Sequence, residues 1–197
     1  MSQSNRSGRI GVAGYMGAGK SAFSALLSEM RGMRYIDADA EAKLLMEGDG
    51  RLRDDLALLF GPTVAVGAAI DFAALGRIAF SSMAEMRKLN SLVHPPLVRR
   101  LRDLAMSRPG PCILDAALIP FWHIEDWFDC CFWVQAAPAS RLQRVLAATG
   151  LPEEAVRQRM LIQETLMAEP AGPNWIFVNN EGTLDDLAAA AGRGLRG

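Results

Sequence analysis

Few cysteines and the lack of any long apolar run exclude several classes of protein. The three cysteines are Cys112, Cys130 and Cys131, an odd number with two adjacent members, which fits neither a disulfide framework nor a metal-ligand spacing. We expect them to be small buried hydrophobic residues. No apolar run reaches the roughly 18 residues that a membrane-spanning helix needs. The polar N-terminus lacks the apolar core of a signal peptide. The sequence therefore predicts a cytoplasmic protein with no membrane partner.

The chain also lacks an excess of charge of either sign. Its formal net charge is −1 at pH 7, so no global positive field would attract nucleic acid, and we expect no such partner. Any bound phosphate must be held by local groups. Half of the 197 residues are hydrophobic, and this length suits one α/β domain, residues 1–197, with a sizeable core.

The most informative stretch runs from Gly14 to Ser21 and reads Gly-Tyr-Met-Gly-Ala-Gly-Lys-Ser. Two glycines separated by four residues and followed by Lys-Ser form the phosphate-binding pattern of nucleotide-binding loops. Glycines let the backbone wrap round an anion, with successive N–H groups pointing inward. Lys20 would reach the β- and γ-phosphates of ATP, and the Ser21 hydroxyl would bind Mg²⁺. The alternative is an ordinary glycine-rich turn between a strand and a helix.

The surrounding sequence favours the nucleotide-binding alternative. Residues 9–13 read as a strand and residues 21–31 as a helix, so the positive end of a helix dipole would face the loop. The predicted nucleotide contacts are Gly14, Met16, Gly17, Ala18, Gly19, Lys20, Ser21 and Ala22.

Alternating strands and helices predict a doubly wound parallel sheet of about five strands. The strands are expected at residues 9–13, 33–36, 112–115, 131–134 and 175–178, and later helices at 139–148, 153–167 and 183–191. Residues 1–8 form a polar tail that we expect to be disordered.

A long helical stretch separates the second predicted strand from the third. Helices are expected at residues 41–47, 51–60, 72–80, 83–93 and 97–107, with Asp71 as an N-cap and a break at His94-Pro95-Pro96. This stretch is too long for a simple crossover, and residues 40–108 are therefore predicted to be an inserted helical region.

Acidic residues end the second predicted strand, at Asp37 and Asp39. The carboxyl ends of strands in open parallel sheets are where ligands bind. A carboxylate there could orient and deprotonate the acceptor of a phosphoryl group held by the loop.

Four stretches together resemble the dephospho-CoA kinase family of P-loop kinases. They are the loop at 14–21, the strand end Ile36-Asp37-Ala38-Asp39, the helix Asp71-Phe72-Ala73-Ala74-Leu75-Gly76-Arg77-Ile78-Ala79-Phe80 and the segment Leu89-Asn90-Ser91-Leu92-Val93-His94-Pro95. The resemblance spans about residues 9–187. It implies transfer of phosphate from ATP, with Mg²⁺, to the ribose 3′-hydroxyl of dephospho-CoA.

The resemblance also implies roles for single residues. Asp39 matches the carboxylate that takes the proton of the ribose hydroxyl, while Asp37 could help through Mg²⁺ or be structural. Lys43, Arg77 and His94 fall in the acceptor-binding region, with solvated or structural positions as the alternatives. Residues 139–168 match the helical lid. The lid residues implied in catalysis are Arg141 and Arg144.

Three positions depart from the family pattern. The stretch 117–121 lacks the acidic residue that often follows the third strand, Ala148 stands at a lid arginine position, and a lid lysine position falls near Glu169. Arg157 and Arg159 are possible replacements. A lid arginine stabilises charge on the transferring phosphoryl group, so two alternatives stay open. One is a catalytically impaired relative that binds nucleotide or CoA in a regulatory role. The other is a different small-molecule P-loop kinase, which would not explain the third and fourth stretches.

Overall fold

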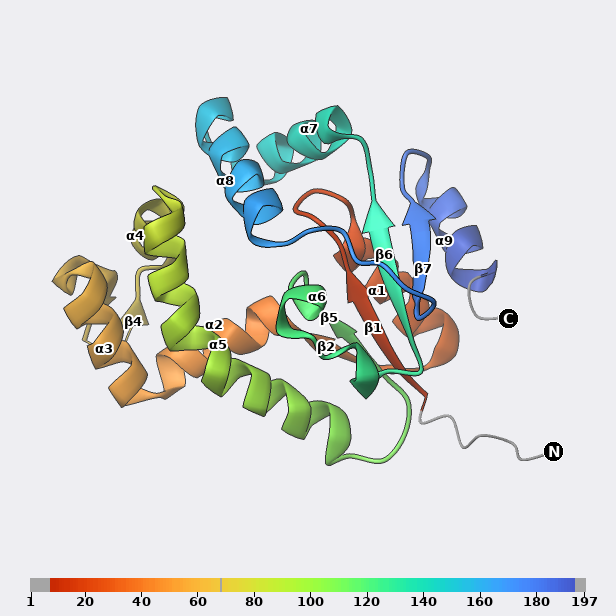
Figure 1. The fold of residues 1–197 in the computed structure, drawn as a ribbon, viewed down its shortest axis with the longest axis horizontal. Helices are drawn as coiled ribbons and strands as arrows, with labels where there is room; N and C mark the ends of the chain where they lie inside the picture. The colour runs from red at the N-terminus through yellow and green to blue at the C-terminus, as the bar shows by residue number, and fades with distance from the viewer. Residues whose placement is uncertain (1–7, 68, 194–197) are drawn as a thin grey trace. The chain divides into compact units, whose positions relative to one another are not determined.

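All five strands of the main sheet run parallel (Figure 1). The computed structural model describes residues 8–67 and 69–193. The strand order is β2-β5-β1-β6-β7, which confirms the predicted parallel sheet. The strands are β1 (Arg9–Ala13), β2 (Arg34–Asp37), β5 (Cys112–Asp115), β6 (Cys130–Gln135) and β7 (Trp175–Asn179).

The order of the strands places a ligand-binding crevice beside β1. After β1, the next strand along the chain is β2, at one edge of the sheet. After β5, which lies beside β1, the next strand is β6, in the opposite direction across the sheet. Such a reversal is where open α/β sheets bind ligands, outside the carboxyl ends of the strands. The glycine-rich loop follows β1 and Asp115 ends β5, so both lie at this crevice.

One face of the sheet is covered by α1 (Lys20–Arg31) and α9 (Leu184–Arg193), which pack against each other. Phe23 and Leu27 of α1 and Leu187 of α9 join buried residues of the central strands in one hydrophobic cluster. The helical spacing of the apolar residues in α1 predicts this face. α1 ends at Gly32, which adopts the left-handed conformation typical of helix C-termini.

The other face of β1 is covered by a short segment that the sequence does not reveal as helical, α6 (Ile119–Trp122) and the 3-10 turn η2 (Glu125–Trp127). Side chains of this segment and of β6 crowd Gly11, and a Cβ there would lie 2.9 Å from Phe128 and 3.0 Å from the Cys131 sulfur. Burial raises the pKa of the Cys131 thiol to about 12, which fits a buried hydrophobic role. Cys112, Cys130 and Cys131 form no disulfide bond.

Residues Ala38–Leu104 form a second compact unit, separate from the sheet unit of residues 1–37 and 105–197. It corresponds to the stretch 40–108 that the sequence predicts as helical. Its elements are α2 (Ala38–Gly48), α3 (Gly50–Phe60), η1 (Pro62–Val64), β3 (Ala65–Val66), β4 (Ala69–Ile70), α4 (Phe72–Ala79) and most of α5 (Met83–Met106). β3 and β4 form an antiparallel pair that was not predicted, because two-residue strands are too short to show a period.

The side-chain caps in this unit follow the expected chemistry. The Asp71 carboxylate accepts a hydrogen bond from the Ala74 N–H at 2.9 Å, which confirms it as the N-cap of α4. Asp49 caps α3 in the same way through the Leu52 N–H.

The predicted helix break at Pro95 and Pro96 is wrong, because α5 continues through both prolines. Each proline removes one helical hydrogen bond. The apolar stripe nevertheless continues at a spacing of four residues through Val93, Leu97 and Leu101, all of which are buried. Burial of this stripe offsets the loss of the hydrogen bonds, since most helix stability comes from packing of the apolar face.

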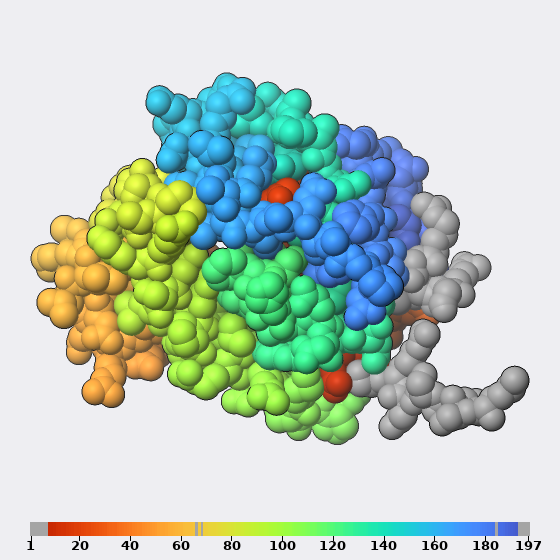
Figure 2. Space-filling model, in the orientation of Figure 1, coloured from red at the N-terminus to blue at the C-terminus, as the bar shows by residue number. Residues whose placement is uncertain are grey.

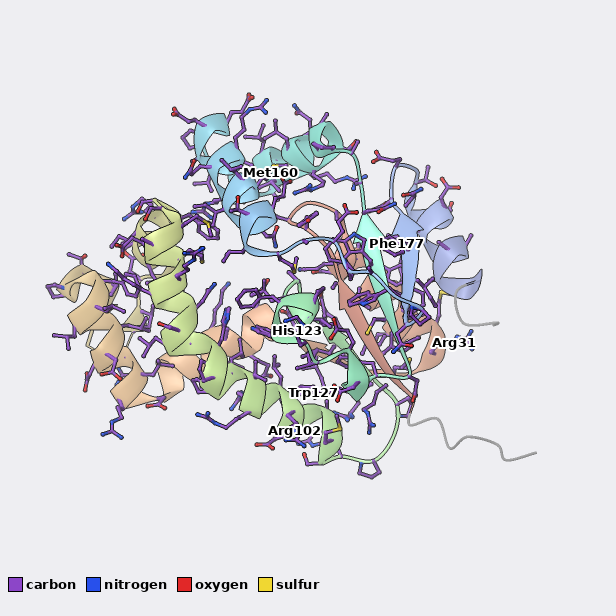
Figure 3. The ribbon with its side chains drawn as sticks, viewed as in Figure 1. Arg31, Arg102, His123, Trp127, Met160 and Phe177 are labelled. Carbon is purple, nitrogen blue, oxygen red and sulfur yellow. The ribbon has the colours of Figure 1, made fainter. Side chains whose placement is uncertain are left out.

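Two helices in contact, α7 (Pro138–Thr149) and α8 (Glu153–Leu166), follow β6, and the chain turns between them at Gly150. They share a hydrophobic cluster that includes Leu142, Val145, Val156 and Met160. In Figure 2, blue atoms of this part of the chain surround a small red patch, which belongs to the N-terminal part of the chain. Figure 3 shows Met160 between the two helices. These are the helices expected at residues 139–168.

The described helices contain no segment long and apolar enough to cross a membrane. The tail expected at residues 1–8 lies outside the described residues apart from Gly8, whose N–H donates to the Asp129 carboxylate at 2.6 Å.

Replacing Gly11 by alanine should lower the free energy of unfolding by roughly 1–3 kcal/mol, because the new methyl group overpacks a filled site. Urea unfolding followed by circular dichroism measures the change. Gly48→Ala is the matched control, since nothing lies within 4 Å of a Cβ at that position. Equal stability of the Gly11 variant and the wild type would contradict this packing.

Candidate functional site

The glycine-rich loop is held in place by its backbone conformation and by packing. Gly17 and Gly19 have φ angles of 76° and 95°, which residues with a Cβ rarely adopt. A Cβ at Gly17 would also press on the Arg141 carbonyl. α1 begins directly after the loop at Lys20, so its first N–H groups and the positive end of its dipole are available to an anion.

A cavity of about 340 Å³ opens beside this loop. Its wall combines the loop, the start of α1, the end of α7 and one side chain of α8. The lining residues are Tyr15, Met16, Gly17, Gly19, Lys20, Ser21, Ala22, Arg144, Val145, Ala148, Thr149 and Arg159. Of the other predicted nucleotide contacts, Gly14 and Ala18 are buried within the loop.

The buried carboxylate of Asp115 lies next to the loop lysine. Its Oδ1 atom is 3.5 Å from Lys20 Nζ, and Asp115 is only 2% exposed. Oδ2 accepts a hydrogen bond from the Tyr35 hydroxyl at 2.8 Å. Sequence reasoning missed both residues as functional. The available signal was an acidic residue at the end of a buried strand, the same signal that identified Asp37.

Tyr35 is held in its neutral form by this environment. Burial, then the charge of Asp115 and the hydrogen bond to it, raise the pKa of Tyr35 above its ordinary value. A hydrogen bond with the Ser21 side chain acts in the opposite direction. The Tyr35 hydroxyl therefore donates to Asp115 across the physiological pH range.

The oxygen atoms at this place fit a magnesium ion. The Ser21 residue is exposed in the cavity wall. Asp115 Oδ1 is buried with no hydrogen-bond partner in the described part of the chain. Mg²⁺ prefers oxygen ligands and is often bound through one or two carboxylates, water and substrate phosphates. The residues present suit such a site, although the described residues contain no cluster of three or more acidic, histidine or cysteine ligands.

Arg141 lies beneath the loop and is only 3% exposed. Its Nε donates to the Met16 carbonyl at 3.0 Å, and its Nη1 pairs with Glu164 of α8 at 2.8 Å. The guanidinium stacks on the Tyr15 ring at 4.8 Å. Its Nη2 has no hydrogen-bond partner among the described residues.

α8 also binds the loop directly. The Gln163 side chain accepts a hydrogen bond from the Met16 N–H at 2.6 Å, and the Tyr15 hydroxyl donates to the Met167 carbonyl at 3.0 Å. α8 and the residue that follows it are therefore attached to Tyr15 and Met16 of the glycine-rich loop.

Arg144 is fixed by three backbone carbonyls. Its guanidinium donates to Gly17 and Ala18 of the loop at 3.3 and 3.4 Å and to Asn180 at 2.7 Å. The Asn180 side chain in turn donates to the Ala18 carbonyl. This network joins α7, the loop and the segment after β7, and it orients Arg144 in the cavity wall.

Arg159 occupies the same cavity wall as Ala148. Burial lowers the pKa of its guanidinium from the ordinary value, which reflects partial removal from water. Arg159 of α8 and Ala148 of α7 thus line the same cavity from neighbouring helices. No described residue near Glu169 lines this cavity.

The remaining predicted site residues belong to the second compact unit. Asp39 is exposed in the first turn of α2. Lys43 is exposed on the same helix, with Nζ 5.8 Å from the centre of the Phe72 ring. Arg77 is exposed in the last turn of α4. His94 is half-buried in α5, and burial lowers its pKa to about 4.

The parallel sheet, the glycine-rich loop and the lysine–aspartate pair define a P-loop phosphotransferase. The family model for dephospho-CoA kinase matches residues 9–186. The chain belongs to the dephospho-CoA kinase family.

Individual relatives agree with this assignment. The dephospho-CoA kinase of Thermobifida fusca is 30% identical over 184 residues, covering 92% of this chain and 91% of the relative. That of Frankia casuarinae is 37% identical over 186 residues, covering 91% and 79%. The crystal structure of TT1252 from Thermus thermophilus superimposes with a TM-score of 0.68 at 30% identity, covering 96% of this chain and 98% of that one.

His94 should make stability depend on pH. Its pKa of about 4 in the folded protein lies below the value of about 6.5 in the unfolded chain, so the unfolded state binds the proton more tightly. Its contribution is present above pH 6.5 and is lost as pH falls toward 4. Between pH 6.5 and 4, the free energy of unfolding should fall by up to roughly 3 kcal/mol less in His94→Gln than in the wild type. Urea unfolding at several pH values measures this difference. His123→Asn is the control, because His123 is exposed with a positive φ that Asn tolerates. Parallel pH profiles of wild type and His94→Gln would contradict the prediction.

Proposed function

We propose that this chain transfers the γ-phosphoryl group of ATP, with Mg²⁺, to the ribose 3′-hydroxyl of dephospho-CoA. The observation that carries the proposal is the pairing of Lys20 with the buried Asp115 at 3.5 Å, beside a glycine loop at a helix N-terminus. Family membership supplies the acceptor. The proposed location is the cytoplasm, and the proposed partners are small molecules, not nucleic acid.

The loop and α1 bind the triphosphate in this proposal. The N–H groups of the loop and of the first turn of α1 contact phosphate oxygens, and Lys20 contacts the β- and γ-phosphates. Ser21 and Asp115 would hold Mg²⁺ directly or through water. When bound, Mg²⁺ would supply positive charge that neutralises the charge developing on the phosphates. Asp115 also keeps Lys20 directed at the phosphates.

Asp39 is the proposed general base. It follows β2 by two residues, so chain connectivity keeps it close to the carboxyl end of that strand, where parallel sheets bind ligands. Its carboxylate would accept the proton of the ribose hydroxyl as the oxygen attacks phosphorus. Lys43, Arg77 and His94 are the proposed contacts of the acceptor. Half-burial and a low pKa make His94 a neutral hydrogen-bonding group in that role.

The arginines of α7 and α8 have different proposed roles. We assign Arg141 and Arg144 to holding the loop, through their bonds to the Met16, Gly17 and Ala18 carbonyls. Arg141 Nη2 has no hydrogen-bond partner among the described residues, so its two N–H groups are the proposed donors to a phosphate oxygen. Arg159 is the proposed replacement for the arginine missing at Ala148, because it lines the nucleotide cavity.

One assay tests the function and separates it from a binding-only role. Purified protein is mixed with Mg-ATP and dephospho-CoA, and CoA formation is compared with that of Lys20→Ala. The expected result is CoA formation by the wild type alone. No CoA above the Lys20→Ala level, with ATP binding still measurable, would favour the regulatory alternative.

Replacing Asp39 by asparagine should lower kcat by about 10²–10⁴-fold, the usual contribution of general-base catalysis. The affinity for ATP should be unchanged. Steady-state kinetics and ATP titration calorimetry measure the two quantities. The control Glu47→Gln makes the same carboxylate-to-amide change at an exposed position of α2 and should keep full activity. A fully active Asp39→Asn enzyme would rule out this base.

Arg159→Ala should lower kcat by about 10³-fold if this residue stabilises charge on the transferring phosphoryl group. Arg157→Ala is its matched control on α8, since Arg157 is exposed and pairs with Glu153 one helical turn away. Single-turnover CoA formation at saturating substrates isolates the chemical step. Equal rates for the two variants would remove Arg159 from catalysis.

A further inference from the structure

Four polar side chains lie close together near the carboxyl ends of β2 and β5, namely Lys20, Ser21, Tyr35 and Asp115. We propose that Tyr35 is a positioning residue for the metal site, and that its hydroxyl holds Asp115 and Ser21 in the orientation that binds Mg²⁺. This inference rests on the proposed kinase function, which needs Mg²⁺ at these residues. It adds a residue that neither the loop pattern nor the acidic strand ends indicate.

The hydrogen bonds run in one direction through Tyr35. Its hydroxyl donates to Asp115 Oδ2 at 2.8 Å, and the nearby Ser21 side chain acts to lower the pKa of Tyr35. A phenolic hydroxyl has a single proton. Because Tyr35 gives that proton to Asp115, Ser21 is the group that can donate between the two hydroxyls. The lone pairs of the Ser21 oxygen are then left for a cation.

Asp115 is held from two sides by different groups. Tyr35 binds Oδ2, while Lys20 lies 3.5 Å from Oδ1, which has no hydrogen bond within the described residues. The carboxylate is 1% exposed as a side chain, so bulk water cannot replace a lost partner. Removing the Tyr35 hydroxyl would leave Oδ2 buried and unsatisfied. The carboxylate would then be free to turn both oxygens toward Lys20 and away from a metal.

The backbone fixes Tyr35 in this place. β2 pairs in parallel with β5, with Tyr35 opposite Ile113 and Asp37 opposite Asp115. Successive side chains of a strand point to opposite faces, so Tyr35 and Asp37 share a face while Ile36 is buried on the other. A one-residue change of register would remove the hydroxyl from Asp115. The pairing of β2 with β5 therefore directs the Tyr35 side chain toward Asp115.

Tyr35→Phe tests the proposal because it removes only the hydroxyl. Isothermal titration calorimetry measures the Kd of ATP with MgCl₂ and with EDTA, for each variant. In the wild type, Mg²⁺ should tighten ATP binding. In Tyr35→Phe this tightening should fall by about tenfold, the scale of one hydrogen bond to a charged group, with the Kd in EDTA unchanged.

The matched control is Tyr15→Phe, the same change at the other tyrosine. Its hydroxyl donates to the Met167 carbonyl at 3.0 Å and not to the metal site, so its two Kd values should change together. The same joint change in Tyr35→Phe would show a merely structural role and overturn the inference, as would an unchanged Mg²⁺ effect. A wild type whose ATP affinity does not respond to Mg²⁺ would instead overturn the proposed metal site.

Discussion

A buried carboxylate needs partners, and the partners of Asp115 tie together three separate parts of the chain. An isolated charge in a protein interior is unfavourable by several kcal/mol. Lys20 comes from the start of α1 and Tyr35 from β2, while Asp115 ends β5. They meet because β5 lies between β1 and β2. The strand order and the electrostatics of the site are therefore one constraint, since any other position of β5 would leave this charge without compensation.

The glycines near the site are needed because they leave room for neighbouring atoms, and not only because of their backbone conformation. Gly11 leaves room for Phe128 and Cys131 on one face of β1, and Gly17 leaves room for the Arg141 backbone. Both close approaches bring another element against the strand or the loop. Gly11 and Gly17 are thus required by the protein's own packing before any phosphate binds.

Short apolar strands and a specific motif made most of the sheet unit predictable. Residues 9–13 and 112–115 match β1 and β5 without error, because both are short apolar runs bounded by loop residues. The continuity of α5 was not predictable from the local pattern, since the pair Pro95-Pro96 breaks most helices and only burial of Val93 and Leu97 explains its persistence. Tyr35 and Asp115 were missed as site residues for a different reason. Their significance depends on which strand or helix lies opposite, and that information is in the tertiary structure.

Met16 is held by α8 through Gln163 and by α7 through Arg141, at its N–H and its carbonyl respectively. A rigid peptide plane links each of these groups to its neighbour in the loop. A shift of either helix is therefore transmitted to the backbone that surrounds the phosphates. The shape of the loop therefore depends on the positions of α7 and α8, through the bonds of Met16 to Gln163 and Arg141.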